Sequence, residues 1–72
     1  MTMTNKVLGD AIGVTPSMAS RIRNGKRLPS IKVLVALADF LGVSIERLLV
    51  AYNEGPDDFG VVVQYSIERS QR

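Results

Sequence analysis

The chain has 72 residues and a net charge of +2, so we expect one domain whose small core is marginal unless it gains a partner, a metal or a crosslink. It has no cysteine and no histidine, which excludes a disulfide and a thiolate metal site and removes the commonest general base and zinc ligand. Its seven acidic residues show no spacing typical of a catalytic pair, so we expect no enzyme, no metal and no cofactor, and elimination favours a homo-oligomer.

The first part of the chain predicts two short helices joined by a tight turn. Thr4 is placed to cap a helix over residues 5–12, and the glycine that follows ends it because glycine adopts a positive φ without strain. Thr15 caps a second helix, with Pro16 at its first position, where the missing N–H costs nothing. Gly9 faces inward, and we expect the second helix to pass too close to it for a side chain.

Two further helices are predicted after a short basic loop. Ser30 caps a helix over residues 31–41, whose apolar residues follow the helical period. Ser44 caps a fourth helix, from residue 45 to about Tyr52. Because caps, closing glycines and apolar periodicity agree, this part of the chain is expected to be helical.

The outer face of the second helix carries side chains that suit the major groove of DNA. They are Ser17, Ser20, Arg21 and Asn24. An arginine fork matches the O6 and N7 acceptors of guanine, and such a pair discriminates between bases by about 1–3 kcal/mol. We therefore expect base contacts from the two serines and Arg21, and an apolar contact from Pro16. The alternative is that Arg21 is solvated or contacts phosphate alone.

The charge is distributed unevenly. Residues 5–32 carry six basic side chains against one acidic one, a net charge of +5, whereas residues 33–72 carry three against six, a net charge of −3. A basic stripe of this kind is typical of a surface that binds a polyanion. The residues expected to contact phosphate on charge alone are Arg23, Lys26, Arg27 and Lys32. The alternative is that they only keep the surface soluble. Asn5, near a helix N-terminus, also fits a phosphate contact.

The pattern changes after residue 52. Residues 53–58 have the composition of a turn or linker, and beyond them apolar residues alternate with small or polar ones, which predicts a half-buried β-strand. Its apolar face consists of Phe59, Val61, Val63, Tyr65 and Ile67. A lone strand leaves its backbone groups without partners, so we expect two copies to pair antiparallel across a two-fold axis. The alternative is a strand that folds back on its own helices.

The predicted organisation is therefore a DNA-binding domain over residues 1–52, a linker over 53–58, and a dimerisation strand and tail over 59–72. The longest apolar stretch, residues 31–43, contains two charged residues and is shorter than the roughly 20 residues of a membrane span. The first residues also lack the apolar core of a signal peptide. We expect no membrane contact and a location in the bacterial cytoplasm, or in the host cytoplasm for a phage protein.

The chain resembles the Cro and phage-repressor type of helix-turn-helix protein, the XRE-like family, from Thr4 to about Leu49. The matching positions are Leu8, Gly13, Val14, Ser17, Ser20, Arg21, Ile22, Asn24, Gly25, Lys26, Pro29, Ser30, Leu34, Ala38, Leu41, Gly42, Val43 and Ser44. The resemblance implies a transcription regulator that binds a short, roughly palindromic operator as a dimer. By position it assigns base reading to Pro16, Ser17 and Arg21, and phosphate contacts to Thr4, Asn5, Asn24 and Lys26.

The chain departs from this family in two places. Relatives usually have another helix before the one that begins at Asn5, and only four residues precede it here. Arg23 stands where the family often has a glutamate, which in relatives pairs with an arginine of that earlier helix. The resemblance therefore implies that both partners are lost together and that one wall of the core is uncovered.

The predicted fold is mainly α: a small helix-turn-helix domain of about four helices, without the family's usual first helix, followed by one C-terminal β-strand that pairs in a dimer. The leading function is a Cro-like repressor of a phage or mobile element that binds double-stranded DNA as a homodimer. One alternative is an antitoxin that autoregulates its promoter and binds a toxin through the C-terminal segment. Another is a protein-interaction module that has lost DNA binding.

Overall fold

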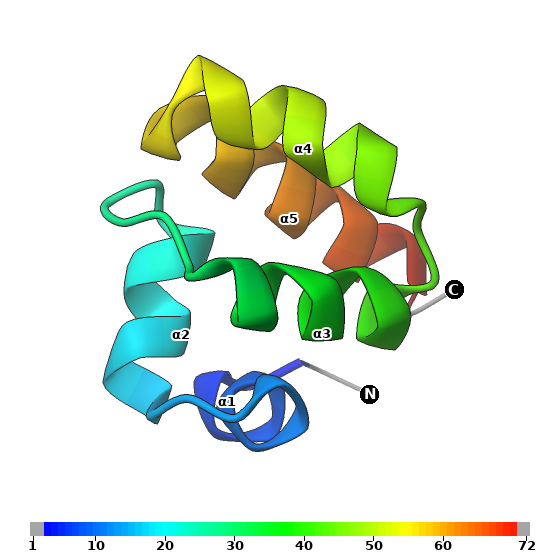
Figure 1. The fold of residues 1–72 in the computed structure, drawn as a ribbon. Helices are drawn as coiled ribbons and strands as arrows, with labels where there is room; N and C mark the ends of the chain where they lie inside the picture. The colour runs from blue at the N-terminus through cyan, green and yellow to red at the C-terminus, as the bar shows by residue number, and fades with distance from the viewer. Residues whose placement is uncertain (1–2, 71–72) are drawn as a thin grey trace.

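The computed structural model describes residues 3–70, which form five α-helices and no β-strand (Figure 1). The helices are α1 (Asn5–Ile12), α2 (Pro16–Arg23), α3 (Ile31–Leu41), α4 (Ile45–Glu54) and α5 (Pro56–Ser70). Two short stretches lie outside the described residues: residues 1–2 of the predicted DNA-binding domain and residues 71–72 of the predicted tail. Arg72, which the charge count of residues 33–72 includes, is one of them. No helix within residues 3–70 combines the length and the apolar character needed to cross a membrane.

The first four helices begin where the sequence predicts them, because each has a hydroxyl cap. The side chains of Thr4, Thr15, Ser30 and Ser44 each accept a hydrogen bond from the backbone N–H three residues later, at 3.1 to 3.3 Å. Such a cap satisfies one of the N–H groups that the first turn of a helix leaves without a partner. The mainly helical character of the prediction is therefore correct, and α4 continues past Tyr52 to Glu54.

The predicted C-terminal strand is wrong, because this segment forms α5. The five residues assigned to the dimerisation face, Phe59, Val61, Val63, Tyr65 and Ile67, divide between two sides of this helix. Phe59, Val63 and Ile67 are four residues apart, which places them on one helical face, and they are 0–1% exposed. Val61 and Tyr65 are 68% and 55% exposed. An antiparallel ribbon between two copies is thus excluded as the role of this segment.

The physical reason for the error is that positions four apart satisfy both periods. A strand repeats every two residues and a helix returns to one face every three or four, so Phe59, Val63 and Ile67 fit either pattern. The start of the segment distinguishes them: Pro56 occupies the first turn of α5, and acidic Asp57 follows it there. Both features favour a helix N-terminus. The helix also satisfies its own backbone groups, so no second chain is needed for them.

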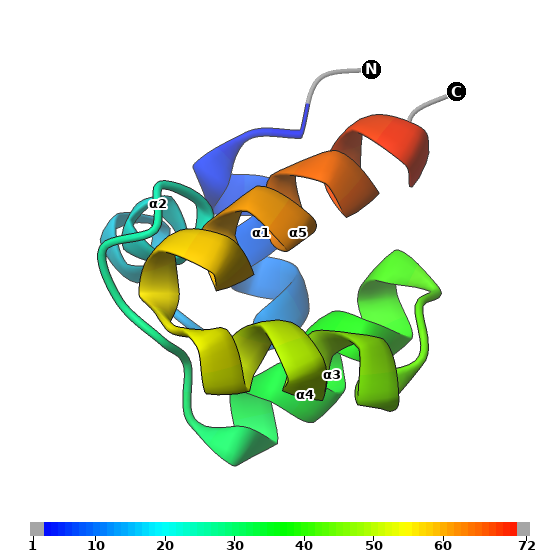
Figure 2. The same cartoon turned by 90° about the horizontal axis from the view of Figure 1, so that it is seen from above.

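All five helices contribute to a single core. Its largest fully buried side chains are Leu8, Ile22, Leu34, Leu37, Leu48, Phe59, Val63 and Ile67. α5 packs against α2, α3 and α4, and Figures 1 and 2 show it running back alongside α4. The ring of Phe59 meets the ring of Tyr52 edge to face, with centroids 5.9 Å apart. α5 therefore contributes Phe59, Val63 and Ile67 to the core, for which the resemblance to the family implied an uncovered wall.

Candidate nucleic-acid interface

The turn between α1 and α2 is tight because one position on α1 has no side chain. A Cβ atom on Gly9 would lie 2.6 Å from the carbonyl oxygen of Val14, closer than real Cβ atoms approach such a group. The atoms closest to Gly9 therefore belong to the turn between α1 and α2, whereas the sequence predicted that the second helix itself would pass close to Gly9. On α2, Ala19 and Ile22 are both fully buried, which fixes the inner face of the helix on the core and turns its other face outward.

The outward face of α2 carries the predicted base-reading residues. Pro16, Ser17 and Arg21 are exposed. Within residues 3–70, the guanidinium of Arg21 has no hydrogen bond or ion pair. Ser20 is only half-buried, and its hydroxyl accepts a hydrogen bond at 3.2 Å from the side-chain amide of Asn24. Three of the four predicted base-reading side chains therefore lie open to an approaching duplex, and the fourth is already engaged.

The predicted phosphate contacts fall into two groups. Lys26, Arg27 and Lys32 are exposed on the loop between α2 and α3 and on the first turn of α3. Thr4 is exposed and caps α1 with its hydroxyl. Lys6, which the charge count also included, pairs with Asp10 at 3.1 Å on α1. Lys26, Arg27 and Lys32 are thus exposed and have no salt bridge among residues 3–70.

Arg23 and Asn5 form the second group, because the structure places them against each other. One terminal nitrogen of the Arg23 guanidinium donates to the side-chain oxygen of Asn5 at 3.1 Å and to the backbone oxygen of Met3 at 2.8 Å. Its Nε donates to Gln64 of α5 at 3.1 Å. These bonds engage three of the five N–H groups of Arg23. Fewer donors therefore remain for a phosphate than at an exposed arginine.

A family model described as Helix-turn-helix, of the XRE type, matches residues 1–48, two thirds of the chain. The chain belongs to the XRE-type helix-turn-helix family. This family consists of DNA-binding transcription regulators and is not a family of enzymes. Comparison with curated proteins and with solved structures gave no match.

The match to the XRE family covers α1, α2, α3 and the first part of α4, and it ends before α5 begins. Gln64 lies in this unmatched part, and sequence reasoning missed its bond to Arg23. In the helix α5, Gln64 lies one turn after Gly60. A Cβ atom built on Gly60 would lie 2.7 Å from the backbone nitrogen of Gly25. The pair of small residues Gly60 and Gly25 was the one available signal that α5 approaches the end of α2.

Proposed function

We propose that this chain regulates transcription by reading a palindromic operator as a homodimer, with α2 as the recognition helix. The observation that carries the proposal is the exposed face of α2, where Arg21 stands without an intrachain partner among residues 3–70. A recognition helix in the major groove reads bases through the side chains near its N-terminal half. Pro16 and Ser17 occupy that part of α2.

The proposed contacts divide by chemistry. Arg21 donates to the O6 and N7 atoms of guanine, Ser17 donates to or accepts from a neighbouring base, and Pro16 packs against a thymine methyl group. Lys26, Arg27 and Lys32 contact phosphates, together with the exposed Thr4 and Asn24. Phosphate contacts add affinity without sequence information, and they make binding weaker as the salt concentration rises.

The finer assignment is a Cro-like repressor of a phage or mobile element. The antitoxin alternative needs a C-terminal segment that is available to bind a toxin. Phe59, Val63 and Ile67 of that segment are instead buried in the core of this chain, which favours the regulator. A module that has lost DNA binding is disfavoured because Pro16, Ser17 and Arg21 lie exposed on α2.

Selection of bound duplexes from random DNA tests the proposal. The expected result is a pair of inverted half-sites with centres about 34–36 Å apart, one helical turn of DNA. Affinity for the selected site should fall steeply as salt is raised from about 50 to 200 mM. Binding that is equal for all sequences, or absent, would remove the regulator from consideration.

A further inference from the structure

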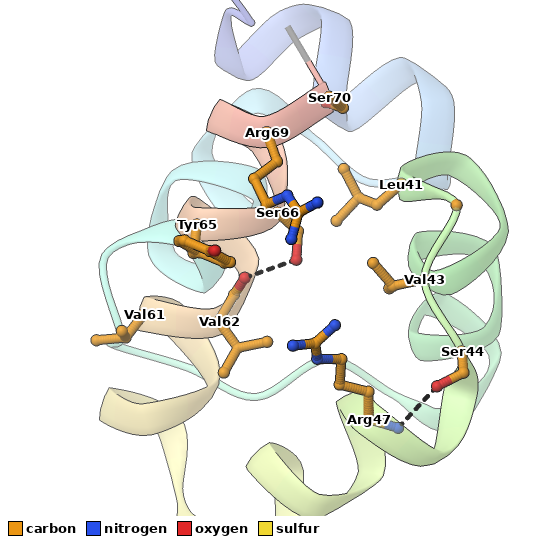
Figure 3. A pocket seen from close by; sticks show the side chains of 11 residues that line it. Leu41, Val43, Ser44, Arg47, Val61, Val62, Tyr65, Ser66, Arg69 and Ser70 are labelled. Carbon is orange, nitrogen blue, oxygen red and sulfur yellow. Dashed lines mark hydrogen bonds between the residues drawn. The ribbon is translucent and has the colours of Figure 1, made fainter. Parts of the chain in front are cut away.

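A groove runs along the outer surface of α4 and α5. None of the residues proposed to contact DNA lines it. Its first part is a hollow of about 620 Å³ between the start of α4 and the end of α5, and the second is a hollow of about 450 Å³ toward the other end of these helices. Arg47, Val61 and Val62 line both hollows, so the two adjoin each other. Figure 3 shows the first hollow, with Arg47 and Arg69 pointing into it from opposite sides.

The middle of this groove is apolar and exposed. Val50 is 63% exposed, Val61 68% and Tyr65 55%. These are three of the seven large hydrophobic side chains that residues 3–70 leave exposed, and they come from two adjacent helices. Apolar residues gathered on one face of a small protein mark an interaction surface more often than scattered ones do.

The two ends of the groove carry opposite charges. α4 and α5 run in opposite directions, so Arg69 lines the first hollow only, Glu54 and Asp58 line the second only, and Arg47 at the start of α4 lines both. All four side chains are exposed. The ion pair found within residues 3–70 is between Lys6 and Asp10, so none of these four has an ionic partner among those residues. Arg69 does lie over the ring of Tyr65, 5.8 Å from its centroid.

We propose that a second copy of this chain occupies the groove, related to the first by a two-fold axis. A two-fold interface requires a surface that is complementary to itself. In a two-fold dimer the two grooves face each other in opposite directions. The acidic end of each copy, with Glu54 and Asp58, then meets the basic end of its partner. The exposed valines and Tyr65 then cover one another between the charged ends.

The inference rests on the dimeric part of the proposed function and names the surface through which the two copies meet. It differs from the excluded strand pairing because the buried side of α5 stays in its own core and only the outer side meets the partner.

Charge exchange between copies tests this surface. The variant R47E/R69E makes the groove acidic at both ends, and E54K/D58K makes it basic at both ends. Each variant alone should self-associate at least about tenfold more weakly than the wild type in sedimentation equilibrium without DNA. An equal mixture of the two should form a heterodimer, because every end then meets its opposite. The matched control D39K/E46K changes the net charge as E54K/D58K does, at exposed positions outside the groove, and should dimerise as the wild type does.

Circular dichroism of each variant establishes that it is folded before its association is measured. A wild-type chain that stays monomeric to about 1 mM overturns the inference and leaves the groove to a different protein. A dimer that the exchanges do not weaken overturns it as well, because the copies then meet elsewhere. Self-association is measured without DNA, so its result does not depend on whether α2 binds DNA. Failure of the proposed dimer surface can therefore be distinguished from failure of the proposed DNA binding.

Discussion

The Nε atom of Arg23, at the end of α2, donates a hydrogen bond of 3.1 Å to the side-chain oxygen of Gln64 on α5. The two residues are 41 positions apart, and their contact is part-buried. It connects the end of α2 to a helix that lies beyond the family match. The orientation of α2 is therefore supported from the C-terminal end of the chain as well as from α1.

A double-mutant cycle on this pair should show coupling. We expect Arg23→Ala to lower the free energy of unfolding by about 1–3 kcal/mol, because it also leaves Asn5 and Gln64 without a donor. Gln64→Ala should cost less, and the double variant should differ from the sum of the two by about 0.5–3 kcal/mol. Urea unfolding measures all three. Strict additivity would mean that the bond contributes nothing to stability.

Arg21 and Lys26 should affect DNA binding in different ways. Arg21→Ala is expected to lose about 1–3 kcal/mol of discrimination at one base pair of each half-site, because the guanine contact is lost. Lys26→Ala should weaken binding to all sequences nearly equally and reduce the salt dependence by about one ion. Titration of single-base operator variants separates the two effects. A uniform loss with Arg21→Ala would place that residue among the phosphate contacts.

Asp57 should oppose DNA binding, because its carboxylate lies beside the end of α2. Built on Gly25, a Cβ atom would lie 3.3 Å from an Asp57 carboxylate oxygen, and Gly25 directly precedes Lys26 of the basic loop. Asp57→Asn is therefore expected to tighten operator binding about twofold to fivefold at low salt, with the gain shrinking as salt screens the charge. Glu46→Gln, on the first turn of α4, is the control and should change affinity little. An affinity for Asp57→Asn equal to that of the control would contradict the prediction.

A comparison of two valines on α5 measures its helical register in solution. Val63 is fully buried and Val61 is 68% exposed. Val63→Ala should lower the free energy of unfolding by about 2 kcal/mol, and Val61→Ala by less than about 0.5 kcal/mol, at a concentration that keeps the chain monomeric. A strand with alternating faces would give the two substitutions similar effects. Equal losses in chemical unfolding would thus argue against α5.

Gly60→Ala should destabilise the chain although alanine favours helices. The gain in helix propensity is about 1 kcal/mol. The added Cβ would lie 2.7 Å from the backbone nitrogen of Gly25, and backbone moves less readily than a side chain. The expected net loss is about 1–2 kcal/mol, read from the thermal midpoint. Gly42→Ala, where nothing lies within 4 Å and φ is 69°, gives the cost of backbone strain alone for comparison.

The parts of the fold that the sequence predicts correctly depend on local chemistry. Thr4, Thr15, Ser30 and Ser44 cap the helices that follow them, and a hydroxyl three residues before its N–H donor can be recognised without any distant contact. The exposure of the outer face of α2 follows from the same reasoning. Once Ala19 and Ile22 are assigned to the core, the side of the helix that bears Arg21 must face outward.

The parts that the sequence does not predict depend on contacts between distant segments. The side chain of Arg23 carries no local sign that Gln64 will bind it, so its charge alone suggested a phosphate contact. The role of α5 is not predicted because Phe59, Val63 and Ile67 fit two periods, and only Pro56 and Asp57, which precede them, favour a helix.

The close approach of Gly60 to Gly25 has a consequence for how the molecule can be divided. The matched region ends at residue 48, yet Phe59, Val63 and Ile67 complete the hydrophobic interior on which α2 rests. A fragment cut at the edge of the match would expose that interior and melt as a whole. The end of the matched region is therefore not a boundary of cooperative folding, and detaching α5 would also remove the support of α2.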